Sequence, residues 1–528
     1  MTRSTFADVE IPNLSVYDFL FGSLDQADLA GNALIDGTTG ATTTYGELVA
    51  QINAVAGALA ARGVDSNTTV GLLCPNSPAF AVVFHSLLRL GAIVTTINSL
   101  YTAEEIASQL NDAGATWLIT VSPLLAGAEE AAKTVGIGAD QLIVLDGAEG
   151  HPSMRDLMMQ QATPPEVSFD PATHIAVLPY SSGTTGRPKG VMLTHRNLVA
   201  NVAQSFGTIG IEHGEVVLAV LPFYHIYGLT VLLNFALKTR SALVTMPRFD
   251  LPEFLRIIQD QKCTWVFIAP PIAVALAKHP LVDQFDLSSV KAVFSGAALL
   301  DANLAGAVAT RINTTVRQGY GMTELSPVSH VIPLDRDDIS LDNIGLALPN
   351  MESKLVDPET GEEIPIPESG VSGPGELMCK GPNVMVGYLG NEDATREMLE
   401  PDGWLHTGDI ATVDSNGVYK IVDRLKELIK YKGYQVAPAV LEAVLLRHPK
   451  VADSAVIGVR DADGQEIPKA FVVIQAGEEL TEDEVMEFVA GQVAPHEKVR
   501  RVEFIDVIPK STAGKILRKD LRAREPAA

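Results

Sequence analysis

The sequence contains few cysteines, and their positions exclude two common uses of this residue. Its three cysteines are Cys74, Cys263 and Cys379, and no two of them form a CxxC pair. This pattern indicates neither a zinc site nor a disulfide framework. Unpaired thiols are typical of a reducing compartment, so we expect a cytoplasmic protein.

Long apolar segments and a secretory signal are also missing. The longest nearly continuous apolar run, WVFIAPPIAVALA at 265–277, is interrupted by two prolines. It is shorter than the about 18–20 residues that a membrane span needs. The first residues, MTRSTFADVE, lack the apolar core of a signal peptide. We therefore expect no integral membrane association, and we interpret 265–277 as a buried core segment or a pocket wall.

Positive charge is scarce. Lys and Arg number 39 against 64 Asp and Glu, which gives a net charge of −25. This balance disfavours nucleic acid as a partner, because phosphate backbones attract basic surfaces. A single nucleotide is not excluded, since local cations and magnesium can supply the positive charge that its site needs.

The N-terminal half alternates helices and strands. Thr44 with Glu47, and Thr102 with Glu105, form possible capping boxes at helix starts. The β-α-β-α-β rhythm predicts parallel strands joined by crossover helices. Short apolar strands are expected at 70–74, 92–97 and 117–120.

The residue composition changes near Asn350, and the segment VDPETGEEIPIPESGVSGPGEL at 356–377 is rich in turn residues. Because 528 residues are too many for one core, we expect at least two domains. The basic cluster DRLKELIK at 423–430 precedes a compact α+β stretch. We predict a large α/β N-terminal domain of stacked sheets at 1–425, a β-rich subdomain within it at about 350–425, and a small mobile α+β C-terminal domain at 426–528.

The segment YSSGTTGRPKG at 180–190 combines glycines, hydroxyls and a lysine, as a phosphate-binding loop does. A strand at 173–180 is expected to enter it and a short strand at 191–193 to leave it, with a helix only after Thr194. A Walker A loop opens directly into its helix, so the spacing excludes a generic P-loop ATPase. A surface linker rarely carries this order of residues. The expected ATP contacts here are Ser181, Ser182, Gly183, Thr184, Thr185 and Lys189.

Three further segments follow in order: QGYGMTE at 318–324, GWLHTGD at 403–409 and PKSTAGKILRKDL at 509–521. Together with SSGTTGRPKG they resemble the signatures of the adenylate-forming superfamily. This superfamily contains acyl- and aryl-CoA synthetases, firefly-type luciferases and peptide-synthetase adenylation domains. Within this superfamily the chain resembles the subgroup of 4-coumarate–CoA ligase and its bacterial relatives, and the resemblance extends from about Ser15 to Arg522.

The resemblance implies ATP, Mg²⁺ and coenzyme A as cofactors, with a small carboxylic acid as substrate. The backbone around Gln318 and Gly319 would line the adenine, and Thr323 would touch the α-phosphate. Glu324 would hold magnesium, because a hard cation prefers carboxylate oxygen. Without the resemblance, this segment would be interpreted as a strand-to-helix turn.

The same resemblance assigns the ribose and the reacting groups. Asp409 and Arg424 would bind the ribose, and Lys515 would bridge the substrate carboxylate and the nucleotide. His225, in LPFYHIYG, would lie beside the carboxylate, although a lone histidine among aromatics is more often a core residue. Composition alone would make the segment around Lys515 a solvated basic tail.

The C-terminal domain of such enzymes rotates about a hinge between two half-reactions, and the hinge residue maps to Lys426. Lys426, Lys430 and Gln435 would contact the nucleotide. The residues implied for coenzyme A are Arg248, Lys432 and Gly433.

The acid pocket implied by the resemblance is apolar and rich in glycine, which suits an elongated or flat acid. Plant hydroxycinnamate ligases often have a small polar residue where Val231 stands, so Val231 favours less polar acids such as cinnamate or a medium-chain fatty acid. The pocket candidates are Tyr227, Val231, Ser295, Gly296, Ala297, Gly319, Gly321, Pro327, Val328 and Val331.

The prediction is therefore an AMP-forming acid–CoA ligase acting through an acyl-adenylate, on an aryl-propenoic acid of the cinnamate or 4-coumarate type. A medium-chain fatty acid–CoA ligase is the main alternative. A fatty acyl-AMP ligase that loads a carrier protein and a luciferase-like oxygenase are weaker alternatives. A non-catalytic sensor would be expected to lack Glu324 or Lys515, and both are present. The oligomeric state is left open.

Overall fold

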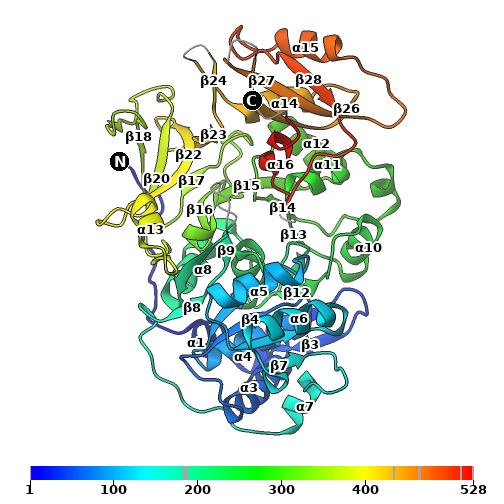
Figure 1. The fold of residues 1–528 in the computed structure, drawn as a ribbon, viewed down its shortest axis with the longest axis vertical. Helices are drawn as coiled ribbons and strands as arrows, with labels where there is room; N and C mark the ends of the chain where they lie inside the picture. The colour runs from blue at the N-terminus through cyan, green and yellow to red at the C-terminus, as the bar shows by residue number, and fades with distance from the viewer. Residues whose placement is uncertain (1, 182–187, 432–433, 462–464, 512–513, 526–528) are drawn as a thin grey trace.

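The computed structural model describes residues 2–181, 188–431, 434–461, 465–511 and 514–525. Two stacked α/β sheets form the lower and central part of the molecule, a β-rich part lies to one side, and the C-terminal residues lie on top (Figure 1). The predicted fold class is confirmed. In the part of the chain that the structure describes, no helix is long and apolar enough to cross a bilayer.

The first large sheet confirms the predicted β-α-β rhythm. β4 pairs in parallel with β5 on one side and with β6 on the other. The hydroxyls of Thr44 and Thr102 accept the backbone N–H groups of Glu47 and Glu105, so both capping boxes form. The strands, in spatial order, are β21 (Gly387–Tyr388), β10 (Lys189–Thr194), β8 (Ile175–Val177), β5 (Ile93–Thr96), β4 (Thr69–Leu72), β6 (Trp117–Thr120) and β7 (Leu142–Val144), with β9 (Tyr180–Ser181) on β10.

The second large sheet is parallel through its centre and contains the run 265–277 as a buried strand followed by a helix. Its strands, in spatial order, are β17 (Leu346–Ala347), β16 (Val328–Val331), β15 (Thr315–Gly321), β14 (Ala292–Ser295), β13 (Trp265–Ile268), β11 (Val216–Ala219), β12 (Ala242–Thr245), β2 (Asn32–Asp36) and β3 (Thr42–Thr44).

A third sheet forms the β-rich part. The N-terminal strand β1 pairs with β18, a contact that the sequence did not predict. The strands are β1 (Thr2–Arg3), β18 (Glu352–Val356), β20 (Gly375–Lys380), β22 (Leu405–Val413) and β23 (Tyr419–Arg424), with β19 (Glu363–Ile364) on β18.

The C-terminal part has hydrophobic clusters of its own, which begin at Ile429. The domain boundary at 425/426 stays a prediction. Its strands are β24 (Ile429–Tyr431), β25 (Tyr434–Val436), β26 (Val451–Arg460), β27 (Glu466–Ile474) and β28 (Arg501–Phe504).

Helices cover the sheets in pairs: α3 packs on α4, α5 on α6, and α11 on α12. The helices are α1 (Val16–Phe21), α2 (Gln26–Ala30), α3 (Tyr45–Ala61), α4 (Pro78–Arg89), α5 (Ala103–Asp112), α6 (Leu125–Val135), α7 (Met154–Met159), α8 (His195–Ile209), α9 (Phe235–Lys238), α10 (Leu251–Gln261), α11 (Pro270–Lys278), α12 (Ala302–Ile312), α13 (Glu392–Met398), α14 (Pro438–Leu446), α15 (Glu482–Ala490) and α16 (Arg518–Arg522).

Candidate active site

Four neighbouring parallel strands, β15, β14, β13 and β11, end at the same edge of the second sheet. The carboxyl edge of a parallel sheet is where α/β proteins usually bind ligands. His225 follows β11, Ser295 ends β14 and Gly319 lies near the end of β15. The topology therefore gathers residues that are about a hundred positions apart in the sequence.

Glu324 lies just beyond this edge, in a short 3₁₀ turn (Thr323–Leu325), and its side chain is buried with 5% exposed. Ser181 Oγ donates a hydrogen bond to Glu324 Oε1 at 3.1 Å, and the Tyr388 hydroxyl donates to the same oxygen at 2.7 Å. Thr323 is buried beside Glu324. The carboxylate thus joins three segments that are distant in the sequence.

The predicted loop lies between two strands, as expected. β9 and β10 form a hairpin in which Ser181 pairs with Lys189, and α8 begins only after its N-cap Thr194. The Lys189 ammonium stands 4.9 Å from the centroid of the Tyr388 ring. Both ends of the loop therefore lie beside the Glu324 cluster. The remaining predicted contacts, Ser182, Gly183, Thr184 and Thr185, lie outside the described residues.

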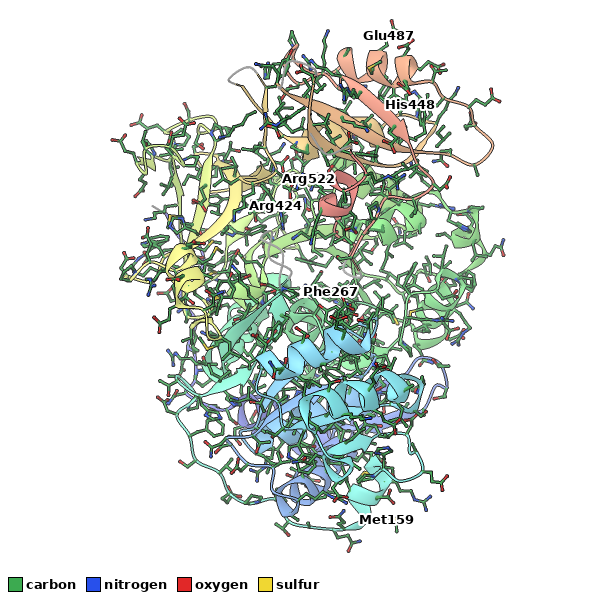
Figure 2. The ribbon with its side chains drawn as sticks, viewed as in Figure 1. Met159, Phe267, Arg424, His448, Glu487 and Arg522 are labelled. Atoms are coloured by element: carbon green, nitrogen blue, oxygen red, sulfur yellow. The ribbon has the colours of Figure 1, made fainter. Side chains whose placement is uncertain are left out.

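Asp409 forms a second polar cluster with two partners. The Tyr320 hydroxyl donates to Asp409 Oδ2 at 2.6 Å, and Arg424 Nε lies 3.6 Å from Asp409 Oδ1. Asp409 and Arg424 face each other across β22 and β23, so the sheet itself brings them together. The structure thus gathers both predicted ribose residues. Arg424 lies where β23 approaches the C-terminal part (Figure 2).

A β-bulge aims Asp409 at this cluster. The register between β20 and β22 shifts between Glu376 and Met378, and Gly408 has a φ of 69°. The Glu376 carboxylate accepts the Gly408 N–H at 3.1 Å and pairs with His406 Nδ1 at 3.0 Å, which raises the pKa of His406. Bulges beside active sites commonly redirect a side chain in this way.

Lys515 reaches the site from the C-terminal part. A Cβ added to the preceding Gly514 would lie 3.2 Å from Pro271 Cδ, so this loop packs against the start of α11. Burial, and then Arg424, lower the pKa of Lys515 to about 8, while Asp409 and Glu324 oppose the shift. Burial and then Lys515 lower the pKa of His225 to about 4. The ammonium is therefore within electrostatic range of both polar clusters.

The predicted acid-pocket residues come from the same strand ends. The ring of Tyr227 contacts the backbone of Gly296, where a Cβ would stand 2.7 Å from the ring. Tyr227 and Val231 belong to a buried π-helical segment, η3 (Tyr227–Asn234). Ala297 directly follows Gly296 and has a positive φ of 68°. Across the β15–β16 hairpin, the paired residues are Gly319 with Val331 and Gly321 with Val328, next to Pro327.

Other predicted residues do not join the clusters in this structure. Arg248, Lys426 and Lys430 are exposed. The Gln318 side chain is used by the protein itself, since it accepts the Leu300 N–H at 3.0 Å and donates to the Leu341 carbonyl. Lys432, Gly433 and the side chain of Gln435 lie outside what the structure describes.

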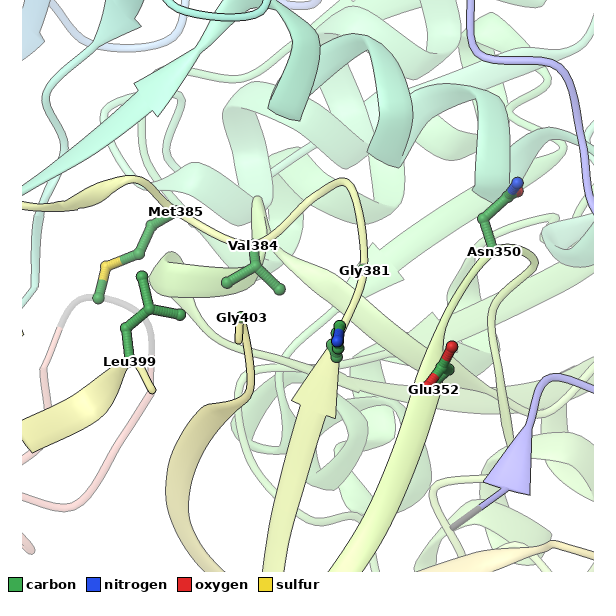
Figure 3. A pocket seen from close by; sticks show the side chains of 8 residues that line it. Asn350, Glu352, Gly381, Val384, Met385, Leu399 and Gly403 are labelled. Carbon is green, nitrogen blue, oxygen red and sulfur yellow. The ribbon is translucent and has the colours of Figure 1, made fainter. Parts of the chain in front are cut away.

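A cavity of about 370 Å³ lies on the β-rich side. Its walls place Val384, Met385 and Leu399 near one another, with Glu352 farther along (Figure 3). None of the predicted acid-pocket residues lines it. A backbone hydrogen bond joins its lining to the site, because the Met385 N–H donates to the Glu324 carbonyl at 2.9 Å. This cavity is therefore separate from the predicted acid pocket.

Sequence reasoning missed three side chains of the clusters: Tyr388, Tyr320 and Glu376. Tyr320 lies inside the GYGMTE motif, and its position there was an available signal. Tyr388 and Glu376 lie outside all four motifs, and only the pairing of distant strands brings them to Glu324 and Gly408.

The fold, together with the Glu324 cluster, the Asp409 cluster and Lys515, is typical of an enzyme that activates its substrate with a nucleotide. The family model for AMP-binding enzymes matches residues 28–389, and the model for their C-terminal domain matches residues 440–515. The chain belongs to the AMP-binding enzyme family.

Curated relatives are similar in sequence to almost the whole chain. The chain is 42% identical to 4-coumarate–CoA ligase 5 of Oryza sativa subsp. japonica, with 99% of this chain and 97% of that protein covered. It is 41% identical to 4-coumarate–CoA ligase 1 of Solanum tuberosum, with coverages of 99% and 96%.

Solved structures give the same result. ATP-bound MatB from Rhodopseudomonas palustris is 30% identical with a TM-score of 0.87, and 97% of this chain and 99% of that chain are covered. The anthranilate CoA ligase AuaEII with anthranoyl-AMP is 26% identical with a TM-score of 0.89, and 98% of each chain is covered. The chain is an AMP-forming acid–CoA ligase that uses ATP, Mg²⁺ and coenzyme A.

Proposed function

We propose that this ligase converts an aryl-propenoic acid, of the cinnamate or 4-coumarate type, into its CoA thioester. A carboxylate oxygen attacks the α-phosphorus of ATP, and pyrophosphate leaves with the electrons of the broken P–O bond. The thiol of CoA then loses its proton to solvent and its sulfur attacks the acyl carbon. The bond between that carbon and the phosphate oxygen breaks, and AMP leaves with its electrons. The observation that carries the proposal is the 42% identity to a 4-coumarate–CoA ligase, which covers 99% of this chain. The charges of Asp409 and Glu324 act on the pKa of Lys515, which supports its role in the first step.

The nucleotide is proposed to lie between the two polar clusters. Asp409 would accept hydrogen bonds from the ribose hydroxyls, with Arg424 beside it. Ser181 and Lys189 would contact the phosphates together with the four loop residues outside the described part. Thr323 would touch the α-phosphate, and the backbone at Gln318 and Gly319 would face the adenine. The pairing of Asp409 with Arg424 supports the ribose assignment, because it presents an acceptor and a donor at one place.

Glu324 fits a magnesium ligand. Among the described residues, both hydrogen bonds to its carboxylate end on Oε1, so Oε2 remains for a cation. Carboxylate oxygen is the ligand that Mg²⁺ prefers. When bound, the ion supplies positive charge that neutralises the ATP phosphates.

Lys515 is proposed to stabilise the negative charge that develops when carboxylate and α-phosphate meet. His225 would lie beside the carboxylate, and burial keeps it neutral at pH 7 because its pKa is about 4. For the thioester step, we propose that residues 426–528 rotate about Lys426 as a mobile domain. Rotation would withdraw Lys515 and bring Lys430, Gln435, Lys432 and Gly433 toward the nucleotide and CoA, with Arg248 on a CoA phosphate.

Two hydroxyls support an acid that carries polar atoms. Tyr227 OH and Ser295 Oγ are buried, and neither has a hydrogen-bond partner among the described residues. A buried hydroxyl without a partner costs about 1–3 kcal/mol, so a bound oxygen that satisfies it stabilises the complex.

A panel of acids tests the substrate class. ATP-, Mg²⁺- and CoA-dependent AMP release is measured with 4-coumarate, cinnamate, octanoate and benzoate. We expect the two propenoates to have the highest kcat/KM. Val231→Ser offers a partner to a ring hydroxyl and is expected to raise the 4-coumarate/cinnamate ratio by about threefold to tenfold. A preference for octanoate in both enzymes would favour the fatty-acid alternative, which the apolar Val231 supports.

The charge state of Lys515 predicts a pH dependence. A pKa lowered to about 8 means that the free enzyme carries the required ammonium below pH 8 and loses it above. The kcat/KM for ATP is therefore expected to fall about tenfold per pH unit on the alkaline side. The residual activity of Lys515→Arg should lack this alkaline limb, since the guanidinium stays charged. An alkaline limb of equal position in both proteins would assign the titration to another group.

We also place the enzyme in the cytoplasm, without a nucleic acid partner. Its three cysteines are free and buried, and its net charge of −25 opposes phosphate backbones. Its partners are small molecules: the acid, ATP and CoA.

A further inference from the structure

Tyr388 has a fixed position beside the phosphate loop. Its strand β21 pairs with β10, and Tyr388 lies opposite Val191, close to the loop's exit. The Tyr388 N–H donates to Thr395 Oγ1 at 2.9 Å, and the neighbouring Leu389 N–H donates to the Gly190 carbonyl at 2.8 Å. The side chain is buried, with 5% exposed. Backbone contacts on both sides therefore determine where its ring and hydroxyl lie.

The Tyr388 hydroxyl selects one oxygen of Glu324. It donates to Oε1 at 2.7 Å, and Ser181 Oγ donates to the same oxygen at 3.1 Å. Two donors on one carboxylate oxygen hold the carboxylate plane in place. In the described part of the chain, no hydrogen bond ends on Oε2. The arrangement separates an anchored oxygen from one that is free to bind a ligand.

The Tyr388 ring has a second contact. The Lys189 ammonium lies over its face, 4.9 Å from the centroid, in the range of a cation–π interaction. The ring thus gives the loop lysine a favourable place next to Glu324. Among the described residues, no ion pair joins Lys189 to Glu324, so the carboxylate charge stays available.

We propose that Tyr388 is a positioning residue: its hydroxyl anchors Oε1 of Glu324, so that Oε2 would be the oxygen available to the metal that accompanies ATP. The inference rests on the proposed role of Glu324 as the magnesium ligand. It assigns Tyr388 no contact with ATP. The ring, by contrast, contacts the Lys189 ammonium. A substitution can therefore remove the role of the hydroxyl and keep that of the ring.

Tyr388→Phe separates them, because it removes the hydroxyl and keeps the ring. The dissociation constant of Mn²⁺ is measured on the full-length enzyme saturated with ATP, by electron paramagnetic resonance. We expect it to rise about tenfold, since a hydrogen bond to a charged group is lost. ATP affinity measured without metal should stay within about twofold, because the Lys189 contact remains. In turnover, the Mg²⁺ concentration for half-maximal rate should rise in parallel.

Tyr180→Phe is the matched control. Its hydroxyl donates to Asp112 Oδ2 at 2.5 Å, away from Glu324, although Tyr180 precedes Ser181 on β9. Its Mn²⁺ affinity should equal that of the unmodified enzyme. Equal weakening in Tyr180→Phe and Tyr388→Phe would overturn the inference, since it would indicate a general effect on the hairpin.

Glu324→Gln distinguishes the proposed role of Glu324 as a metal ligand from the proposed positioning role of Tyr388. It should weaken Mn²⁺ binding at least as much as Tyr388→Phe, and the double variant should lose no more than Glu324→Gln alone. If Glu324→Gln weakens metal binding but Tyr388→Phe does not, the positioning role is wrong and the metal site stands. If Glu324→Gln leaves metal binding unchanged, the metal assignment fails and the inference fails with it.

Discussion

Replacing Lys515 with alanine is expected to reduce adenylate formation by about 10²–10³-fold, the usual cost of removing one donor that stabilises transition-state charge. The same variant should form the thioester from supplied acyl-adenylate and CoA at close to the normal rate. The physical reason is that the ammonium offsets the repulsion between the substrate carboxylate and the α-phosphate, and this repulsion arises only in the first step. Pyrophosphate exchange measures the first step, and consumption of the supplied adenylate measures the second.

Lys519→Ala is the control for this prediction. Lys519 lies on α16 four residues after Lys515, and its side chain is exposed. Its loss removes an equal charge from the same part of the chain and should leave both steps unchanged. Equal losses of both steps in Lys515→Ala would contradict the role of Lys515 in the first step.

Lys426→Pro is expected to reduce thioester formation by more than tenfold while adenylate formation falls much less. In this structure Lys515 is already buried where the charges of Asp409 and Glu324 act on its pKa, and the first step needs its ammonium near both carboxylates. Proline fixes φ near −65° and restricts the residue before it, so the chain at 425–426 loses the freedom that rotation requires. The two half-reactions are measured separately, as for Lys515.

Lys426→Ala is the matched variant, because it removes the side chain and keeps backbone freedom. It should form the thioester much faster than Lys426→Pro, although both variants lose the expected contact of the Lys426 side chain with the nucleotide. If alanine and proline impair the second step equally, the lysine side chain is responsible and rotation about this residue is not supported.

Local features of the fold were predictable from the sequence, because their causes are local. Thr44 and Thr102 lie three residues before a glutamate, and the capping boxes form as expected. The late start of α8 followed from Thr194 and the strand before it. The β-α-β rhythm predicted parallel pairing of β4 with β5 and β6.

Features that depend on long-range pairing could not be predicted. β1 joins β18 across about 350 residues, and β21 joins β10 across about 195. Neither register leaves a local signal, and the pairing of β20 with β22 leaves none either, so the roles of Tyr388 and Glu376 could not be predicted before the fold was known. Gln318 shows that a motif residue need not present its side chain to the ligand, because its side chain accepts a hydrogen bond from the Leu300 N–H. The motifs therefore identified the residues of the candidate site, whereas the side chains that bind them depend on the strand pairing.

The most direct test of the account follows the oxygen atoms. The acid is supplied with ¹⁸O in its carboxylate, and the products of one turnover with ATP, Mg²⁺ and CoA are analysed by mass spectrometry. One ¹⁸O is expected in AMP and none in pyrophosphate, because the carboxylate attacks the α-phosphorus. Label in inorganic phosphate, or unlabelled AMP, would contradict an acyl-adenylate held between Glu324, Asp409 and Lys515.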